Sequence, residues 1–284
     1  MVKMTMNELS QELTAEELRE LEAAEKKEPV FDDDSPVMMR EQLMQFKRIN
    51  HQNRTKPTIS LRIVLKQLDQ MGCDRIICCG DIIGIGPYPE ETVQELVHLP
   101  GLMSVRGNHE GYLLEGMPTE YPNEENMSFG EMEHHRWEHH LLSAESVAFL
   151  RSMPYRIDFA SEGFVISVMH SCMDRNGHFS GSKKNPSESD LSDMFADVDS
   201  DIILYGHDHA RNICKSEKLY INVGSLGCPS RDRNIARAGI LTIEHGNAGI
   251  ETGDVMYHVD EVIHQIDMIH YPEADIIKKI FYGL

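Results

Sequence analysis

Several short apolar segments of this 284-residue chain each end in a side chain that can bind a metal or a proton. The segments are rich in Ile, Val and Leu, as is typical of strands covered on both faces. Ligands of open α/β sheets bind at the carboxyl ends of the strands, because neighbouring strand ends bring distant residues together. We therefore expect the polar residues that follow these segments to meet at one edge of a sheet. They are Asp81, Asn108, His109, His170, His207 and His209.

This set of donors is typical of a metal site. A carboxylate, an amide oxygen and several imidazoles suit a borderline divalent ion such as Mn, Fe, Ni or Zn. Gly80, Gly107 and Gly206 precede three of the donors, where a tight backbone bend needs a small residue. His207 and His209 are two residues apart and so project to one side of an extended segment. Each signal alone also fits a turn or a hydrogen-bonded core residue, whereas the ordered set predicts a metal centre.

The composition excludes several classes of partner. The chain has 47 acidic and 27 basic residues and a net charge of −20, which disfavours general affinity for nucleic acid or an anionic membrane surface. No apolar run approaches the roughly 18 residues that span a membrane, and we expect no secretory signal. The six cysteines form no CxxC pair, and Cys78 and Cys79 lie inside an apolar segment. We therefore expect free thiols and a cytoplasmic location.

Two compositions meet within the chain. Residues 7–28 are rich in Glu and Leu and predict an acidic surface helix. Residues 40–66 form a basic arm with seven Lys or Arg and one acid, and within it the sequence TISLRI, residues 58–63, alternates like a short strand. Strands and helices alternate from there onward. We therefore predict an appendage over residues 1–62 and an α/β domain over residues 63–284.

The domain is predicted to contain six strands and several helices. The strands are expected over residues 75–80, 101–107, 163–170, 201–207, 219–224 and 238–243. Helices are expected at residues 89–99, within residues 124–152 and in the closing segment 271–283, and residues 171–190 are expected to form a polar loop.

Five segments carry a resemblance to a known family: CGDIIGIGPYPEE, VRGNHE, VMHS, LYGHDH and INVGSLGCP. They resemble the signature blocks of calcineurin-like metallophosphoesterases, in particular the small bacterial phosphodiesterases related to YfcE and to diadenosine tetraphosphatases. The likeness extends over most of Ile63 to Leu284. It implies a four-layer α/β/β/α sandwich that hydrolyses a small phosphate ester or a nucleotide-like substrate.

The resemblance also implies the roles of the donors. Two metal ions lie side by side in the family, bridged by the aspartate that corresponds to Asp81. One ion is further held by the counterparts of Asn108, His170 and His207. The other ion takes the counterpart of His209 together with an Asp-x-His motif on the first strand.

Further residues are implied to act on the substrate. His109 is placed to stabilise or protonate the departing oxygen. Gly224 and Ser225 follow a strand and are expected to present backbone or hydroxyl donors to the substrate. Arg231 and Arg233, in the next loop, are expected either to meet phosphate oxygens or to remain solvated.

The Asp-x-His motif is not found in this sequence. Counting back from the predicted helix IVLKQLDQMG places residues 53–55 there, and a four-residue insertion places residues 49–51 there; neither restores the aspartate. Residues 29–63 instead resemble the front of BrnA-type antitoxins, in which TISLRI corresponds to the strand of a ribbon-helix-helix unit. We therefore expect the first core strand to be missing or replaced, and one well-formed metal position next to an incomplete one.

A second group of histidines lies in the segment HHRWEHH, residues 134–140. His135 and His139 are i, i+4 neighbours on a helix, which raises the alternative of another metal site. Trp137 lies between them, and the family resemblance implies a covering helix here. The sequence therefore favours packing and pocket lining over metal binding.

Three functions remain open from the sequence. The first is a metal-dependent phosphoesterase, impaired by the loss of the Asp-x-His ligands. The second is a metal-binding relative without catalytic activity. The third is a regulator whose basic arm, residues 40–66, contacts DNA or a toxin.

Overall fold

The computed structural model describes residues 59–284 except 124, 175–176 and 229–233. The chain divides near residue 55, and all of the described residues belong to the second unit, Thr55–Leu284. The predicted acidic helix and most of the basic arm lie outside the described residues. The predicted domain boundary, between residues 62 and 63, falls inside the first described helix.

A five-stranded mixed sheet forms the centre of the domain, in the order β3-β4-β5-β7-β6. The three inner strands run parallel, and the two edge strands are antiparallel to their neighbours. Its members are β3 (Arg156–Ser161), β4 (Phe164–Met169), β5 (Ile202–Leu204), β6 (Asn212–Lys215) and β7 (Leu219–Asn222). Because β4 and β5 are parallel neighbours, the residues that follow them meet at the same edge of the sheet.

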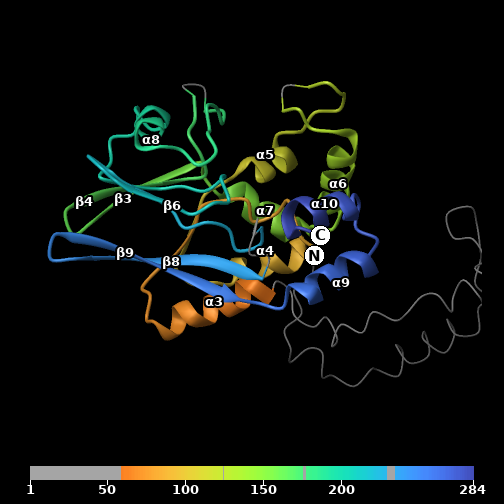
Figure 1. Ribbon diagram of the computed structural model, residues 1–284, viewed down its shortest axis with the longest axis horizontal. Coiled ribbons are helices and arrows are strands. Elements are labelled where there is room, and N and C mark those ends of the chain that lie inside the picture. Colours follow the sequence, from red (N-terminus) through yellow and green to blue (C-terminus); the bar gives the residue numbers. More distant parts are fainter. Residues whose placement is uncertain (1–58, 124, 175–176, 229–233) are drawn as a thin grey trace, which may run out of the picture. The chain divides into compact units, whose positions relative to one another are not determined.

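Two further pairs of strands form separate sheets. β1 (Ile76–Cys78) and β2 (Leu102–Ser104) form a parallel pair, and β8 (Ile235–Glu244) and β9 (Asn247–Met256) form a long antiparallel hairpin. The hairpin lies across one face of the central sheet (Figure 1). Apolar side chains of both fill the space between them; among these are Ile166, Val168, Ile202, Ile221, Leu241 and Ile250.

Helices cover the outer face of the central sheet and the outer face of the β8–β9 hairpin. α8 (Glu188–Met194) packs on the far face of the central sheet through Leu191, which lies with Ile203 and Tyr220 in one apolar cluster. α3 (Ile59–Gln70), α9 (Val259–Met268) and α10 (Ala274–Tyr282) pack on the outer side of the hairpin. The remaining helices are α4 (Pro89–Val97), α5 (Asn108–Leu114), α6 (Phe129–His140) and α7 (Ala144–Ser152). The predicted α/β class with helices around a mixed sheet is confirmed.

The prediction of a strand over TISLRI is wrong. Residues 59–63 form the first turns of α3. Leu61 and Val64 are buried, and Leu68 packs one turn further on in the same apolar cluster as Val64, which is the spacing of a helix face. An alternating pattern over six residues fits either a strand or a helix. The apolar contacts of Val64 and Leu68, which follow it, show that the segment is a helix.

Other differences concern short elements. The strands β3, β6 and β9 were not expected, because their polar residues interrupt the apolar pattern. The segment 124–152 divides into α6 and α7, and α8 begins within the expected loop 171–190. None of the helices that the structure describes is both long and apolar enough to cross a membrane.

Candidate metal centre

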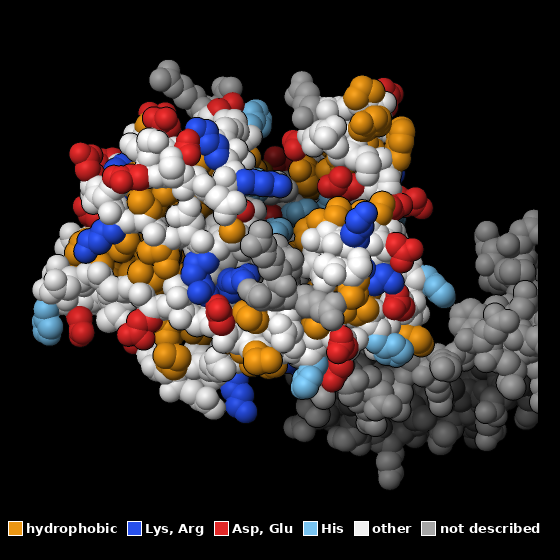
Figure 2. All heavy atoms as spheres, viewed as in Figure 1, with side chains coloured by type: hydrophobic (Ala, Val, Ile, Leu, Met, Phe, Trp, Pro, Cys, Tyr) orange, Lys and Arg blue, Asp and Glu red, His pale blue; other side chains and the backbone are white. Residues whose placement is uncertain are grey.

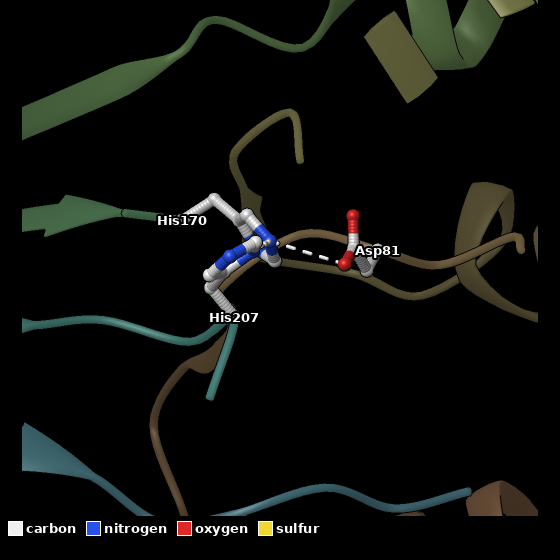
Figure 3. A group of neighbouring side chains, drawn as sticks. All are labelled: Asp81, His170 and His207. Carbon is white, nitrogen blue, oxygen red and sulfur yellow. Dashed lines mark hydrogen bonds and ion pairs between the residues drawn. The ribbon is translucent and has the colours of Figure 1, made fainter. Parts of the chain in front are cut away.

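Four side chains from four strand ends converge at the carboxyl edge of the sheets. Asp81 follows β1, Asn108 begins α5 after β2, His170 follows β4 and His207 follows β5. His170 Nε2 lies 3.0 Å from Asp81 Oδ2 and 3.1 Å from Asn108 Oδ1. His207 Nδ1 lies 3.1 Å from Asn108 Oδ1 and 3.3 Å from His170 Nε2. Figure 3 shows the two imidazoles side by side, with the carboxylate of Asp81 facing them.

The orientation of His170 is set by the backbone directly after β1. Its Nδ1 lies 2.7 Å from the carbonyl oxygen of Cys79, which can only accept a hydrogen bond. Nδ1 is therefore protonated, and Nε2 is the ring nitrogen that faces Asp81 and Asn108. Burial opposes a charge on His170, but Asp81 outweighs it and raises the pKa of the imidazole. Burial likewise opposes ionisation of Asp81, but His170 and His109 hold its pKa below the usual range.

The backbone around these donors is strained and tightly packed. Asp81 and His207 both adopt left-handed conformations, with φ of 54° and 65°, which cost free energy for residues other than glycine. A Cβ atom on Gly107 would overlap the Asp81 carboxylate. Such strain persists only where the surrounding structure determines it, and it is concentrated at functional sites.

Glu110 organises this part of the backbone and was not identified from the sequence. Its carboxylate accepts four backbone N–H groups: Oε2 accepts from Asp81 and Gly107, at 3.0 and 2.7 Å, and Oε1 accepts from Ile82 and Ile83, at 2.7 and 3.2 Å. Burial and the charge of Asp81 raise the pKa of Glu110 to about 7, whereas the four donors favour its ionised form. A glutamate three residues after Gly107, at the start of a helix, was the available signal.

His109 lies beside the four donors. Its backbone N–H donates to Asp81 Oδ1 at 3.2 Å, and its Nε2 lies 3.8 Å from Asp81 Oδ2. Gly84, with φ of 121°, packs directly on the imidazole, since a Cβ there would lie 2.5 Å from two ring atoms. Burial lowers the pKa of His109, so the ring is neutral near pH 7.

The four donor atoms fit a single divalent ion. One carboxylate, one amide oxygen and two imidazole nitrogens face one point, and a neutral His170 offers the lone pair of Nε2 to an ion there. The sequence positions expected to replace the Asp-x-His motif, residues 49–51 and 53–55, lie outside the described residues.

Comparison with known proteins gives the family. Residues 51–246 match the sequence profile of the calcineurin-like phosphoesterase superfamily domain. The chain belongs to this superfamily. It is also similar to the uncharacterized protein MJ0912 of Methanocaldococcus jannaschii, with 28% identity over 247 residues, which cover 79% of this chain and 93% of that protein.

Two crystal structures share the fold. Hypothetical protein PH1004 from Pyrococcus horikoshii has a TM-score of 0.65 and 16% identity, over 79% of this chain and 93% of the other. A metallophosphoesterase from Sphaerobacter thermophilus has a TM-score of 0.58 and 21% identity, over 80% of this chain and 94% of the other. Phosphoesterases of this superfamily are metal-dependent hydrolases of phosphoric esters.

Further residues predicted for the phosphoesterase site include His209 and two arginines. His209 lies outside the group formed by Asp81, His170 and His207, whose ligand atoms are all within 4.8 Å of one another. Partial burial lowers the pKa of His209, and the charge of Asp81 opposes this shift. Arg231 lies outside the described residues, as does Arg233.

The predicted substrate loop already makes hydrogen bonds of its own. The N–H of Gly224 donates to Asn222 Oδ1 at 2.9 Å. Ser225 Oγ accepts from the N–H groups of Gly227 and Cys228, at 3.3 and 3.1 Å. The N–H of Gly224 is therefore engaged within the loop, and the hydroxyl group of Ser225 also interacts with the thiol of Cys228.

The face of the domain seen in Figure 2 is hollowed. Figure 2 shows histidine side chains inside a hollow between the part built on the central sheet and the part that carries α6 and α10. Acidic and basic side chains are interspersed over the same face, so the visible surface carries no continuous basic patch.

Proposed function

We propose that this chain hydrolyses small phosphodiesters or nucleotide-like phosphate esters, with a divalent ion held by Asp81, Asn108, His170 and His207. The observation that carries the proposal is the convergence of four donor atoms from four separate strand ends, within 3.0 to 3.3 Å of their neighbours. Membership of the calcineurin-like superfamily supports the reaction class.

Each residue of the site has a part in this proposal. When bound, divalent metal supplies the Lewis acidity that hydrolysis of a phosphoric ester requires. Asn108 contributes a neutral oxygen, so only Asp81 adds negative charge to a site that must accept an anion. His109 donates a hydrogen bond or a proton to the departing oxygen as water adds to phosphorus and the ester P–O bond breaks. Ser225 donates its hydroxyl proton to a phosphoryl oxygen.

Two finer assignments belong to the same proposal. The mixture of oxygen and nitrogen donors is compatible with manganese. All six cysteines are free, and Cys78 and Cys79 have their pKa raised by burial, to about 11 and about 12, which fits unreactive thiols in a reducing cytoplasm. Gly224 and Arg231 remain candidate substrate residues because of their places in the sequence, Gly224 directly after a predicted strand and Arg231 in the following loop.

A second function is favoured by one feature of the chain, which is the lack of an Asp-x-His motif in the sequence. A protein that keeps one metal position and lacks the ligands of its neighbour fits a metal-binding relative without turnover. The third alternative, an antitoxin-like regulator, loses its ribbon strand, because residues 59–63 are helical.

Hydrolysis of bis(p-nitrophenyl) phosphate, together with the metal content per chain, tests the proposal. We expect Mn²⁺-dependent release of nitrophenol that is abolished in His207→Ala and retained in His264→Ala, which removes an exposed imidazole on α9. A chain that holds stoichiometric metal and shows no turnover would identify the inactive relative. A chain that binds no metal at the Asp81 site would refute both.

A further inference from the structure

A second cluster of potential ligands lies on the inner face of α6. The imidazoles of His135 and His139 and the carboxylate of Glu138 each offer one atom, and these atoms all lie within 4.8 Å of one another. His135 and Glu138 are each only 1% exposed. The spacing explains the grouping, because positions i, i+3 and i+4 share one face of a helix.

Most of the polar atoms in this cluster have no hydrogen-bond partner among the described residues. These atoms are His135 Nδ1, His135 Nε2, Glu138 Oε2 and His139 Nε2. Buried polar side-chain atoms are nearly always paired, because burying one without a partner costs about 1–3 kcal/mol. Three neighbouring side chains that each leave such an atom unpaired therefore require a ligand or a physical reason for their placement.

The charge of the cluster points to a cation. Glu138 Oε1 accepts the N–H of Gly84 at 2.8 Å, and Oε2 lies 3.9 Å from His135 Nδ1, too far for a hydrogen bond. No Lys or Arg within the described part of the chain pairs with this carboxylate. Burial opposes ionisation of Glu138, but the contacts with His135 and Gly84 lower its pKa. Burial lowers the pKa of His139 to about 4, so this ring is neutral and keeps a lone pair.

We propose that His135, Glu138 and His139 bind a divalent transition ion of the zinc class, at a site separate from the phosphoesterase centre. Two imidazoles and a carboxylate form a donor set that zinc accepts, and histidines at i, i+4 on a helix are a recurrent zinc-binding arrangement. A charged group buried inside a protein requires a partner of opposite charge, and an ion at this position provides one for the carboxylate of Glu138. The packing role favoured by the sequence leaves these atoms unpaired.

The position of the site indicates what the ion does. Gly84, whose N–H is held by Glu138, packs against the ring of His109. The ring centroids of His109 and His135 lie 5.0 Å apart. Glu138 also lines a small cavity of about 70 Å³ beside residues 82–89. All three ligands lie on α6, and Glu138 holds the loop that supports His109 through the N–H of Gly84. The ion therefore has a structural role, which is to hold Glu138 in the position that supports this loop.

The metal content of a variant that lacks the phosphoesterase centre tests this site. In tag-free Asp81→Asn/His207→Asn protein, stripped with chelator and then dialysed against Zn²⁺, we expect about one zinc per chain by mass spectrometry. Adding His135→Asn and His139→Asn should remove it. Adding His140→Asn, which changes an exposed imidazole on the same helix, should leave it in place. No zinc in the starting variant, or zinc retained after both substitutions, overturns the proposal.

A single isosteric change keeps the test decisive if the double substitution prevents folding. Glu138→Gln retains an oxygen acceptor for Gly84 but removes the charge. In the same background we expect Zn²⁺ to raise the melting temperature by several degrees with Glu138 present and by much less with Gln. An equal zinc-induced rise in both proteins contradicts the site.

Discussion

His170 and Cys79 are joined by a hydrogen bond that orients one of the side chains of the proposed metal centre. The Nδ1–H group of His170 donates to the carbonyl oxygen of Cys79 across 2.7 Å, and the opposite ring nitrogen faces Asp81. Histidines that bind metals commonly donate their other N–H to a carbonyl group, which fixes the tautomer and the ring orientation. The carbonyl group of Cys79, directly after β1, therefore orients Nε2 of His170 toward the position proposed for the ion.

The role proposed for His109 predicts a loss of turnover without loss of metal. His109→Gln should lower kcat for bis(p-nitrophenyl) phosphate by about 10²–10⁴-fold, the usual contribution of a positioned acid or hydrogen-bond donor. Its ring is not among the four donors, so the manganese content per chain should not change. Loss of the metal together with activity would instead make His109 a ligand.

Gly107 should be intolerant of any side chain. Gly107→Ala introduces a Cβ that overlaps the carboxylate of Asp81, so this donor must move. We expect the affinity for Mn²⁺ to fall by at least about 10-fold, as for other disturbances of ligand orientation, measured by calorimetric titration. Gly253→Ala is the control, because a Cβ at Gly253 meets no atom within 4 Å. Equal affinity in the two variants would contradict the close packing of Gly107 on Asp81.

Glu90 should make the stability of the domain depend on pH. Its Oε2 accepts the N–H of Ser143 at 2.9 Å, at the N-terminus of α7. Burial opposes ionisation, but this N–H and the hydroxyl groups of Ser143 and Ser146 outweigh it and lower the pKa of Glu90. A carboxyl group with a lowered pKa stabilises the fold above its unfolded pKa of 4.5, and this contribution is lost as the pH falls through the folded value.

Urea unfolding of Glu90→Gln measures this contribution. We expect the variant to be less stable than the wild type by about 0.5–1.5 kcal/mol at neutral pH, the range of a hydrogen bond with helix-dipole support. The difference should shrink as the pH falls below 4.5 and through the lowered pKa of Glu90. Glu217→Gln, an exposed loop substitution, should show neither effect. A difference that is constant with pH would assign the effect to packing.

The helical structure of residues 59–63 can be tested through packing. Leu61 is buried on α3, whereas Lys66 is exposed on the same helix. Leu61→Ala should reduce the free energy of unfolding by about 2–4 kcal/mol, as for other truncations of buried leucines. Lys66→Ala should change it by less than about 0.5 kcal/mol. Similar small effects at both positions would remove the support for a packed α3.

The sequence alone determined which side chains could meet at the metal centre. Asp81, His170 and His207 follow apolar segments that the sequence predicted to be covered strands, and a residue next to a strand in the chain is held at its end. Covalent adjacency and the apolar pattern therefore sufficed to predict the edge of the sheet and the donor types. The family resemblance of the same segments rests on these residues as well.

The tertiary structure decided what depends on contacts between distant segments. Residues 59–63 are helical because a helix buries Leu61 and Val64, and a short alternating pattern does not reveal this burial. The tautomer of His170 was set by a carbonyl 91 residues away, and Glu110 acquired its role from the N–H groups of another loop. The i, i+4 spacing showed that His135 and His139 share a helix face; only packing showed that this face is buried around unpaired atoms.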